Sequence, residues 1–127
     1  MVKRILIVDD EEDTAKLLEL TLARFIDDFT IYAAEDGNAA IATVELLKDA
    51  GISPDITIMD LRMPKMDGVE CTKRLTLLGV TNIHILSGFL NPEIIETAHE
   101  AGATAILDKG EGYTTVATKI ADNLRGK

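Results

Sequence analysis

Five short apolar runs, separated by segments with helical periodicity, set the strongest limit on the fold of this chain. The runs are rich in Ile, Val and Leu and cover residues 5–8, 30–33, 56–59, 83–86 and 105–107. Four of them are nearly continuous rather than alternating in apolar character, which is typical of parallel strands covered by helices on both faces. The sequence therefore predicts a doubly wound α/β domain with a five-stranded, mostly parallel sheet and five helices.

The segments between the runs place apolar residues three or four positions apart, as on one face of a helix. Leu22 and Phe25 have this spacing in the first segment, and the last helix is expected over residues 113–125. Asn91 followed by Pro92 is a typical helix start, because asparagine caps the first turn and proline suits its first position. Each predicted strand is thus followed by a predicted helix.

Length and charge narrow the classes of protein to which the chain can belong. Its 127 residues suffice for one core, so we expect a single domain over residues 1–127. The net charge of -9 disfavours direct binding to nucleic-acid phosphates. The single cysteine, Cys71, cannot close an intrachain disulfide, and no apolar run has the length of a signal peptide or membrane span. We therefore expect a cytoplasmic protein that does not insert into membranes.

Polar residues follow four of the five apolar runs at the point where each predicted strand ends. They are Asp9 and Asp10 after the first run, Asp60 after the third, Ser87 after the fourth and Lys109 after the fifth. Ligands of open α/β sheets bind outside the carboxyl ends of the strands, where the strand order reverses. We therefore expect these side chains to converge at one edge of the sheet.

The carboxylates in this set predict a metal site. Two carboxylates about 4 Å apart repel by about 4 kcal/mol at an effective dielectric of 20, and a bound cation removes that cost. A few carboxylates with water suit Mg²⁺ better than a Ca²⁺ cage. A simpler interpretation of residues 9–13 is an acidic helix start that favours the helix dipole. It accounts for Glu11, Glu12 and Asp13 but not for Asp60.

Lys109 permits two interpretations. It could form a surface ion pair with Asp108, which would contribute little. Beside Asp60, a Mg²⁺ ion and the Ser87 hydroxyl, it would instead stabilise a phosphoryl group during transfer. In that interpretation Asp60 is a carboxylate nucleophile that forms an aspartyl phosphate.

Taken together, these motifs closely resemble the receiver domain of bacterial two-component response regulators. The resemblance extends over nearly the whole chain. It is carried by Asp9-Asp10, Asp60, the run Met63-Pro64-Lys65-Met66-Asp67-Gly68, Ser87-Gly88, Ala101-Gly102-Ala103 and Lys109. It implies the flavodoxin-like (βα)5 fold and a stand-alone unit of the chemotaxis-regulator type.

The resemblance also implies a reaction. Asp60 would accept a phosphoryl group from a phosphohistidine on a sensor histidine kinase or phosphotransfer protein, or from a small donor such as acetyl phosphate. Ser87 and Lys109 would hold the phosphoryl oxygens. A receiver catalyses its own phosphorylation and then hydrolyses the product, so the resemblance implies a timed signalling switch rather than a metabolic enzyme.

A metal ligand set and a partner surface follow from the same resemblance. Asp10, Asp60 and the backbone carbonyl of Arg62 would bind Mg²⁺ directly, and Asp9 would contribute through water. Phosphorylation would change a face that binds downstream proteins, built from residues 92–101, 105–107 and 113–125. We expect a monomer.

Two positions differ from the family pattern, and two others bear on the lifetime of the phosphoryl group. Gly110 follows Lys109 where the family usually has proline in a cis peptide. A cis bond before another residue costs about 3 kcal/mol, so we expect a trans bond here. Ile106 stands where a switch aromatic is usual. Arg62 and Phe89 occupy positions that govern water access in the family, and we expect slow self-dephosphorylation from shielding.

Three alternatives have different sequence requirements. A receiver-like module could bind partners without phosphorylation, an alternative that the Gly110 and Ile106 differences leave open. A phosphatase of the aspartyl-phosphate type requires a second acid where this chain has Arg62. A calcium loop at residues 9–13 requires glycine where Thr14 stands and a bidentate glutamate where Leu20 stands.

Overall fold

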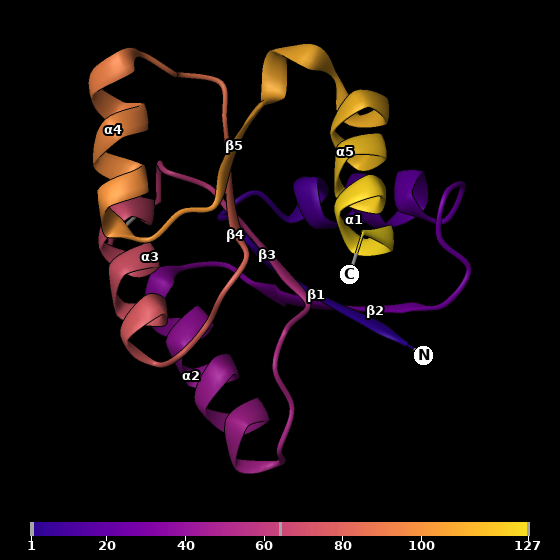
Figure 1. Ribbon diagram of the computed structural model, residues 1–127, viewed down its shortest axis with the longest axis horizontal. Helices are drawn as coiled ribbons and strands as arrows, with labels where there is room; N and C mark the ends of the chain where they lie inside the picture. The colour runs from indigo at the N-terminus through magenta and orange to yellow at the C-terminus, as the bar shows by residue number, and fades with distance from the viewer. Residues whose placement is uncertain (1, 64, 127) are drawn as a thin grey trace.

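Five strands lie side by side in one parallel sheet in the order β2-β1-β3-β4-β5 (Figure 1). The computed structural model describes residues 2–63 and 65–126, so Pro64 and the two end residues of the predicted domain lie outside the described residues. The strands are β1 (Lys3–Val8), β2 (Phe29–Ala34), β3 (Ile56–Met59), β4 (Ile83–Ser87) and β5 (Ala105–Asp108). The helices are α1 (Glu12–Leu22), α2 (Gly37–Asp49), α3 (Gly68–Leu77), α4 (Pro92–Ala101), the short 3-10 helix η1 (Lys109–Glu111) and α5 (Tyr113–Arg125).

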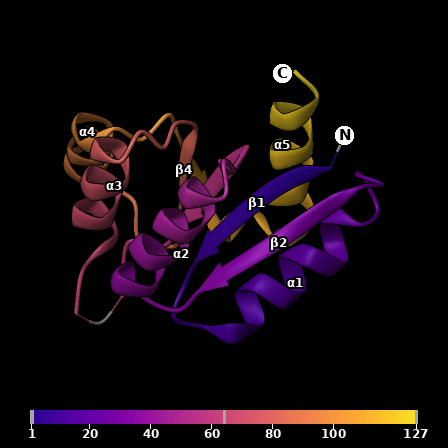
Figure 2. The ribbon, with the colours of Figure 1, turned by 90° about the horizontal axis from the view of Figure 1, so that it is seen from below.

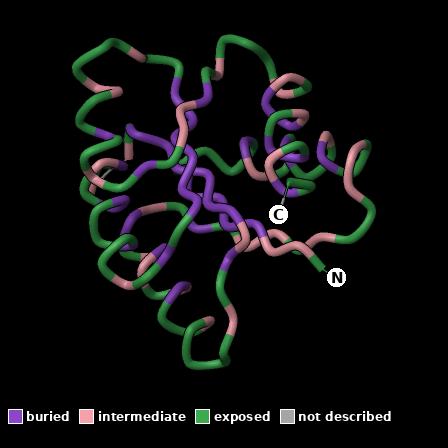
Figure 3. The backbone as a smooth tube through the Cα atoms, viewed as in Figure 1, coloured by how far each residue is buried: buried purple, intermediate pink, exposed green. Residues whose placement is uncertain are grey.

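The sheet separates two apolar cores. Leu6 and Val8 of β1 pack in one core with α2, α3 and α4, whereas Ile5 and Ile7 pack in the other with α1 and α5. Figures 1 and 2 show the helices in these two layers, and Figure 3 shows the central strands buried between them. Successive strand residues point to opposite faces, so a strand covered on both faces needs apolar residues throughout. The predicted doubly wound α/β architecture is confirmed.

The two edge strands explain the weaker apolar runs. β2 pairs only with β1, and five of its six residues are half-buried or exposed, with only Ala34 buried. β5 pairs only with β4 and has a single buried residue, Leu107. Both edges are more open to solvent than the central β1, β3 and β4, whose apolar runs are the most continuous.

Local side-chain caps set the helix starts. Asp36, Asp67 and Asn91 precede α2, α3 and α4, and each side chain accepts a bond from a backbone N–H in the first turn. The Asn91-Pro92 helix start is confirmed. The last helix also has the predicted bounds.

The first helix is shorter than its apolar spacing suggests. α1 ends at Leu22, and the backbone N–H groups of Phe25 and Ile26 both donate to the Leu22 carbonyl at 2.9 Å. This tight turn takes Phe25 out of the helix, yet its ring still packs against the core formed with α1 and α5. Phe25 therefore has the sequence spacing of a helical residue although it lies beyond the end of α1, because the turn brings its side chain to the core side of that helix.

Two further expectations concern the backbone. Within the described ranges there is no cis peptide bond, so the Lys109–Gly110 bond is trans as predicted. No helix in that part of the chain is both long enough and apolar enough to cross a membrane.

Candidate functional site

Three aspartates meet at the carboxyl edge of the sheet. Asp9 and Asp10 follow β1, Asp60 follows β3, and one carboxylate oxygen from each lies within 4.8 Å of the others. The N–H of Asp9 donates to Ala34 at 3.0 Å and the N–H of Asp60 donates to Val8 at 2.9 Å, so both backbones are still held by the sheet. Asp9 and Asp60 are buried and Asp10 is exposed. The predicted convergence of these carboxylates is confirmed.

Hydrogen bonds and one ion pair hold the two buried carboxylates. Asp9 Oδ1 accepts the backbone N–H of Glu11 at 2.8 Å, and Asp60 Oδ1 accepts the backbone N–H of Arg62 at 3.2 Å. Lys109 Nζ lies 3.2 Å from Asp9 Oδ2. The ion pair joins the first strand of the chain to the last across the site.

The partner of Lys109 decides between its two interpretations. Its side chain is 24% exposed and reaches Asp9 rather than Asp108, so it belongs to the site and is not a simple surface pair with its neighbour. Burial lowers the pKa of Lys109, but the nearby charges of Asp9 and Asp60 outweigh burial and the net pKa is raised. Lys109 is therefore a permanent cation at this edge.

Asp60 is in an unfavourable environment for a negative charge. Burial and the Asp9 carboxylate raise the pKa of Asp60 from 3.8 to about 6, against the smaller opposing effects of Lys109 and the Arg62 N–H. Only 6% of Asp60 is exposed. A cation placed among the three carboxylates would relieve this repulsion.

The oxygen donors fit Mg²⁺. Three carboxylates, two of them buried, form an all-oxygen set, and Mg²⁺ binds through a few carboxylates and retains several waters. The exposed Asp10 leaves the site open to water and to a substrate oxygen. The part assigned to the Arg62 carbonyl stays a prediction, as does the water-mediated part of Asp9.

A glycine allows α3 to approach Asp60. The N–H of Gly68, the first residue of α3, donates to the carbonyl of Leu61 at 3.0 Å. A Cβ built at Gly68 would overlap the carbonyl oxygen of Asp60 and the backbone of Leu61. The Asp67-Gly68 pair of the sequence motif is thus explained by a helix cap followed by a backbone contact.

Asp60, Ser87 and Lys109 line one pocket of about 310 Å³. Ser87 is 2% exposed, and its Oγ accepts the N–H of Phe89 at 3.1 Å. The guanidinium carbon of Arg62 lies 3.7 Å from the centre of the Phe89 ring. The pocket residues are Asp10, Glu11, Asp60, Arg62, Ser87, Gly88, Phe89 and Lys109.

Two features of this pocket lay outside the sequence prediction. The acidic helix start accounted for Glu11, which nevertheless lines the pocket. The position of Glu11 directly after Asp10 was the sequence feature that could have predicted its place in the pocket. The stacking of Arg62 on Phe89 was also not predicted, although both positions had been linked to water access.

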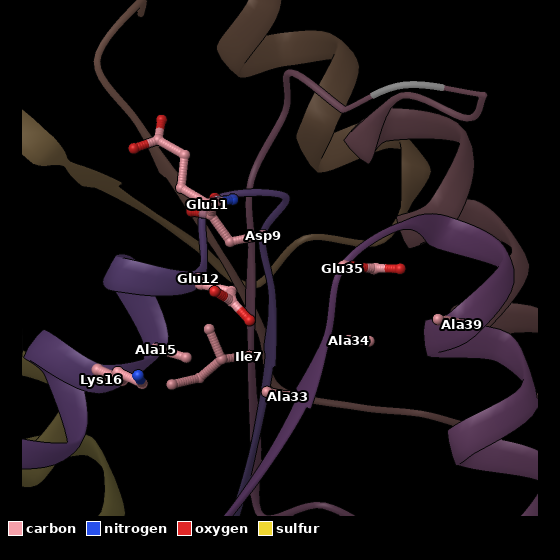
Figure 4. A pocket seen from close by; sticks show the side chains of 10 residues that line it. All are labelled: Ile7, Asp9, Glu11, Glu12, Ala15, Lys16, Ala33, Ala34, Glu35 and Ala39. Atoms are coloured by element: carbon pink, nitrogen blue, oxygen red, sulfur yellow. The ribbon is translucent and has the colours of Figure 1, made fainter.

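A second hollow of about 350 Å³ lies beside the aspartates, between the start of α1 and the end of β2 (Figure 4). Its lining combines apolar side chains, such as Ile7 and Ala15, with the acidic Glu12 and Glu35. Asp60, Ser87 and Lys109 do not line it, and Glu11 points away from Ile7 in this view. Asp60, Ser87 and Lys109 therefore share the other pocket.

Comparison with known proteins gives a consistent result. Residues 5–121 match the family model of the response regulator receiver domain. Transcriptional regulatory protein PdtaR of Mycobacterium tuberculosis is 33% identical over 110 residues, which are 84% of this chain and 49% of that protein. Transcriptional regulatory protein LiaR of Bacillus subtilis is 35% identical over 128 residues, 96% of this chain and 54% of that protein.

The fold also matches solved structures. The response regulator domain of Thermotoga maritima CheB superposes with a TM-score of 0.83 at 25% identity, covering 99% of this chain and 96% of that domain. Chemotaxis protein CheY4 of Vibrio cholerae gives a TM-score of 0.79 at 25% identity, with 96% and 98% coverage. The chain spans about half the length of the curated relatives PdtaR and LiaR.

Proposed function

Because this chain belongs to the response regulator receiver domain family, we propose that Asp60 is the residue that accepts the phosphoryl group. The observation that carries the proposal is the shared pocket in which the Asp60 carboxylate lies with Ser87 and Lys109, next to Asp9 and Asp10. A nucleophile, a hydroxyl, a cation and a carboxylate metal site are the groups that phosphoryl transfer to an aspartate requires. Residues 1–127 then form one receiver domain.

The transfer step makes one bond and breaks another. A carboxylate oxygen of Asp60 attacks the phosphorus of a phosphohistidine on a sensor histidine kinase or phosphotransfer protein. The O–P bond forms while the P–N bond breaks, and the imidazole leaves with the electron pair. Above a pH of about 6 the carboxylate of Asp60 is mostly ionised and can attack.

Ser87 and Lys109 stabilise the transferred group. The Ser87 Oγ uses a lone pair to accept the Phe89 N–H, so its own hydrogen is available to a phosphoryl oxygen. Lys109 moves from Asp9 toward the phosphoryl group, whose charge then replaces the Asp9 carboxylate as its partner.

Asp10, Asp60 and the Arg62 carbonyl would hold Mg²⁺, and Asp9 would contribute through water. The bound ion supplies positive charge that offsets the carboxylates and the incoming phosphoryl oxygens. Removal of the metal is expected to abolish transfer, because the carboxylate cluster would then repel the donor.

The product is hydrolysed by water at the same pocket. The stacked Arg62 and Phe89 side chains both line its wall and limit water access to Asp60. Slow self-dephosphorylation follows from this shielding. The domain is in that sense an enzyme acting on itself, and its biological role is that of a switch.

The output is a change in protein binding. We assign it to the face built from residues 92–101, 105–107 and 113–125, where α4 and α5 flank the edge strand β5. Ile106 stands in place of a switch aromatic, is half-buried and packs on the core with α4, so coupling through a rotating aromatic side chain at this position is not available. Monomeric state, cytoplasmic location and absence of nucleic-acid binding stay predictions, as does the activity of any longer protein.

The alternative of a module that never becomes phosphorylated is not favoured. The chain matches the response regulator receiver domain family, and the five residues of the proposed chemistry are all present. A phosphatase of the aspartyl-phosphate type is also not favoured, because Arg62 stands where such an enzyme normally has its second acid.

Intact-mass spectrometry tests the proposal. The protein is incubated with acetyl phosphate, with and without Mg²⁺, alongside Asp60→Asn and the control Asp27→Asn, which changes an exposed carboxylate in the turn after α1. We expect one Mg²⁺-dependent adduct of about 80 Da, the mass of a phosphoryl group, in the wild type and the control only. An adduct that persists in Asp60→Asn would reject Asp60 as the acceptor. No adduct from acetyl phosphate or a kinase donor would reject the reaction.

A further inference from the structure

The turn between β5 and α5 is closed by a side chain to which the phosphoryl chemistry assigns no part. Asp108 is the last residue of β5 and is exposed. Its Oδ1 accepts the backbone N–H of Gly110 at 2.8 Å. This bond spans Lys109, so the lysine lies in the middle of an Asx turn.

The direction of this turn determines where Lys109 points. Asp108 is paired in register with Ser87, and the Cβ of Lys109 lies 4.0 Å from the position of a Cβ built at Gly88. From there Lys109 Nζ reaches across the pocket to Asp9 Oδ2 at 3.2 Å. A rotation of the backbone at residues 108–110 would carry the ammonium group away from both Asp9 and Asp60.

Because residue 110 is glycine, the backbone of this turn needs a restraint from another residue. Glycine has more backbone freedom than any other residue, so it does not fix the turn by itself. A Cβ built at Gly110 would lie 3.1 Å from Asp108 Oδ1, which is a tight contact. The closed turn therefore suits glycine, and the Asp108 carboxylate supplies the missing restraint.

The far end of the turn is held by different groups. The N–H of Gly112 donates to the carbonyl of Lys109 at 3.1 Å. Lys119 Nζ on α5 lies 3.0 and 3.2 Å from the two carboxylate oxygens of Glu111. The Glu111 pair joins the last residue of η1 to α5, and Glu111 does not accept the Gly110 N–H, so Glu111 serves as a control for the loss of a nearby carboxylate.

We propose that Asp108 is a positioning residue for Lys109: by accepting the Gly110 N–H, it holds the backbone on both sides of the lysine and directs Nζ into the phosphoacceptor pocket. The phosphorylation consequence of this inference rests on the proposed function. The placement of Lys109 itself does not.

One experiment compares Asp108→Ala, Asp108→Asn and Glu111→Gln in the acetyl phosphate reaction with Mg²⁺. Asparagine keeps an oxygen acceptor for the Gly110 N–H, whereas alanine removes it. We expect Asp108→Ala to slow formation of the phosphoryl adduct by about fivefold, the factor that one ordinary hydrogen bond contributes, and the other two variants to stay near the wild-type rate. If Asp108→Asn were as slow as Asp108→Ala, the acceptor would not be what matters and the proposal would be overturned.

A second measurement needs no phosphodonor. Acetylation of lysines by an N-hydroxysuccinimide ester is followed by peptide mass spectrometry, with the exposed Lys16 as the internal reference. We expect Asp108→Ala to raise labelling of Lys109 by about fivefold, because the ammonium group leaves Asp9 more often, and Asp108→Asn to match the wild type. Unchanged labelling in Asp108→Ala would overturn the proposal. If the wild-type protein formed no phosphoryl adduct, the proposed function would be rejected. The labelling of Lys109 would then still test whether Asp108 positions this lysine.

Discussion

Replacing Asp60 with asparagine is expected to stabilise the metal-free protein. Burial and the Asp9 carboxylate raise the pKa of Asp60 from 3.8 to about 6, so the folded protein binds this proton more tightly than the unfolded chain. The resulting stabilisation is complete below pH 3.8 and is lost as the pH rises through about 6. Asparagine is uncharged at every pH and avoids the loss.

The expected magnitude follows from the pKa difference. At a pH of about 8, ionisation of Asp60 lowers the free energy of unfolding by about 3 kcal/mol, and near pH 4.5 by only about 1 kcal/mol. Asparagine retains an oxygen that accepts the Arg62 N–H, so most of this difference should appear in Asp60→Asn. At typical urea dependences the unfolding midpoint near pH 8 should rise by about 1–3 M.

The assay is urea unfolding in a chelator, followed by far-ultraviolet circular dichroism because the chain has no tryptophan. Asp27→Asn serves as the control for removing one negative charge from a protein of net charge -9. Saturating Mg²⁺ is expected to stabilise the wild type and to narrow its difference from Asp60→Asn, because the cation neutralises the three carboxylates. The reasoning is refuted if Asp60→Asn near pH 8 is no more stable than Asp27→Asn, or if its gain is the same near pH 4.5.

Three other predictions address neighbouring features. Phe89→Ser should shorten the phosphoryl half-life by about twofold to fivefold, the value of one cation–π contact, as followed by decay of the mass adduct; an unchanged half-life would contradict shielding. Gly68→Ala should lower the free energy of unfolding by about 1–3 kcal/mol through overlap with the Asp60 carbonyl, whereas Gly126→Ala should be neutral; equal urea midpoints would contradict the close approach. The Cys71 thiol, fully buried and with its pKa raised by that burial to about 11, should react with a thiol reagent at neutral pH only as fast as the protein unfolds.

The architecture and most of the site could be predicted because they depend on periodicity and strand order. A continuous apolar run requires cover on both faces, and β1 has it, with Leu6 and Ile7 in opposite cores. Asp9 and Asp60 follow such runs, so a parallel sheet necessarily brings them to one edge. Neither inference needed the orientation of any side chain.

What could not be predicted depends on side-chain direction and local turns. The sequence spacing of Phe25 is that of a helical residue, but the residue lies in the turn after α1, where its N–H donates to the Leu22 carbonyl. Lys109 pairs with Asp9, which is distant in sequence, whereas the adjacent Asp108 accepts the Gly110 N–H. Arg62 meets Phe89 across two loops that follow different strands. Sequence spacing places such residues near one another but does not set their contacts.

The ion pair between Asp9 and Lys109 joins residues 100 positions apart, and this separation has a consequence during synthesis. A nascent chain carries Asp60, the proposed phosphoryl acceptor, well before Lys109 leaves the ribosome. Until β5 docks beside β4, the emerging chain has the acidic groups without Lys109, the residue proposed to hold the phosphoryl oxygens. Under the proposed function, the order of translation thus delays phosphorylation until the sheet is complete, and a polypeptide released before β5 would contain Asp60 but not the complete pocket around it.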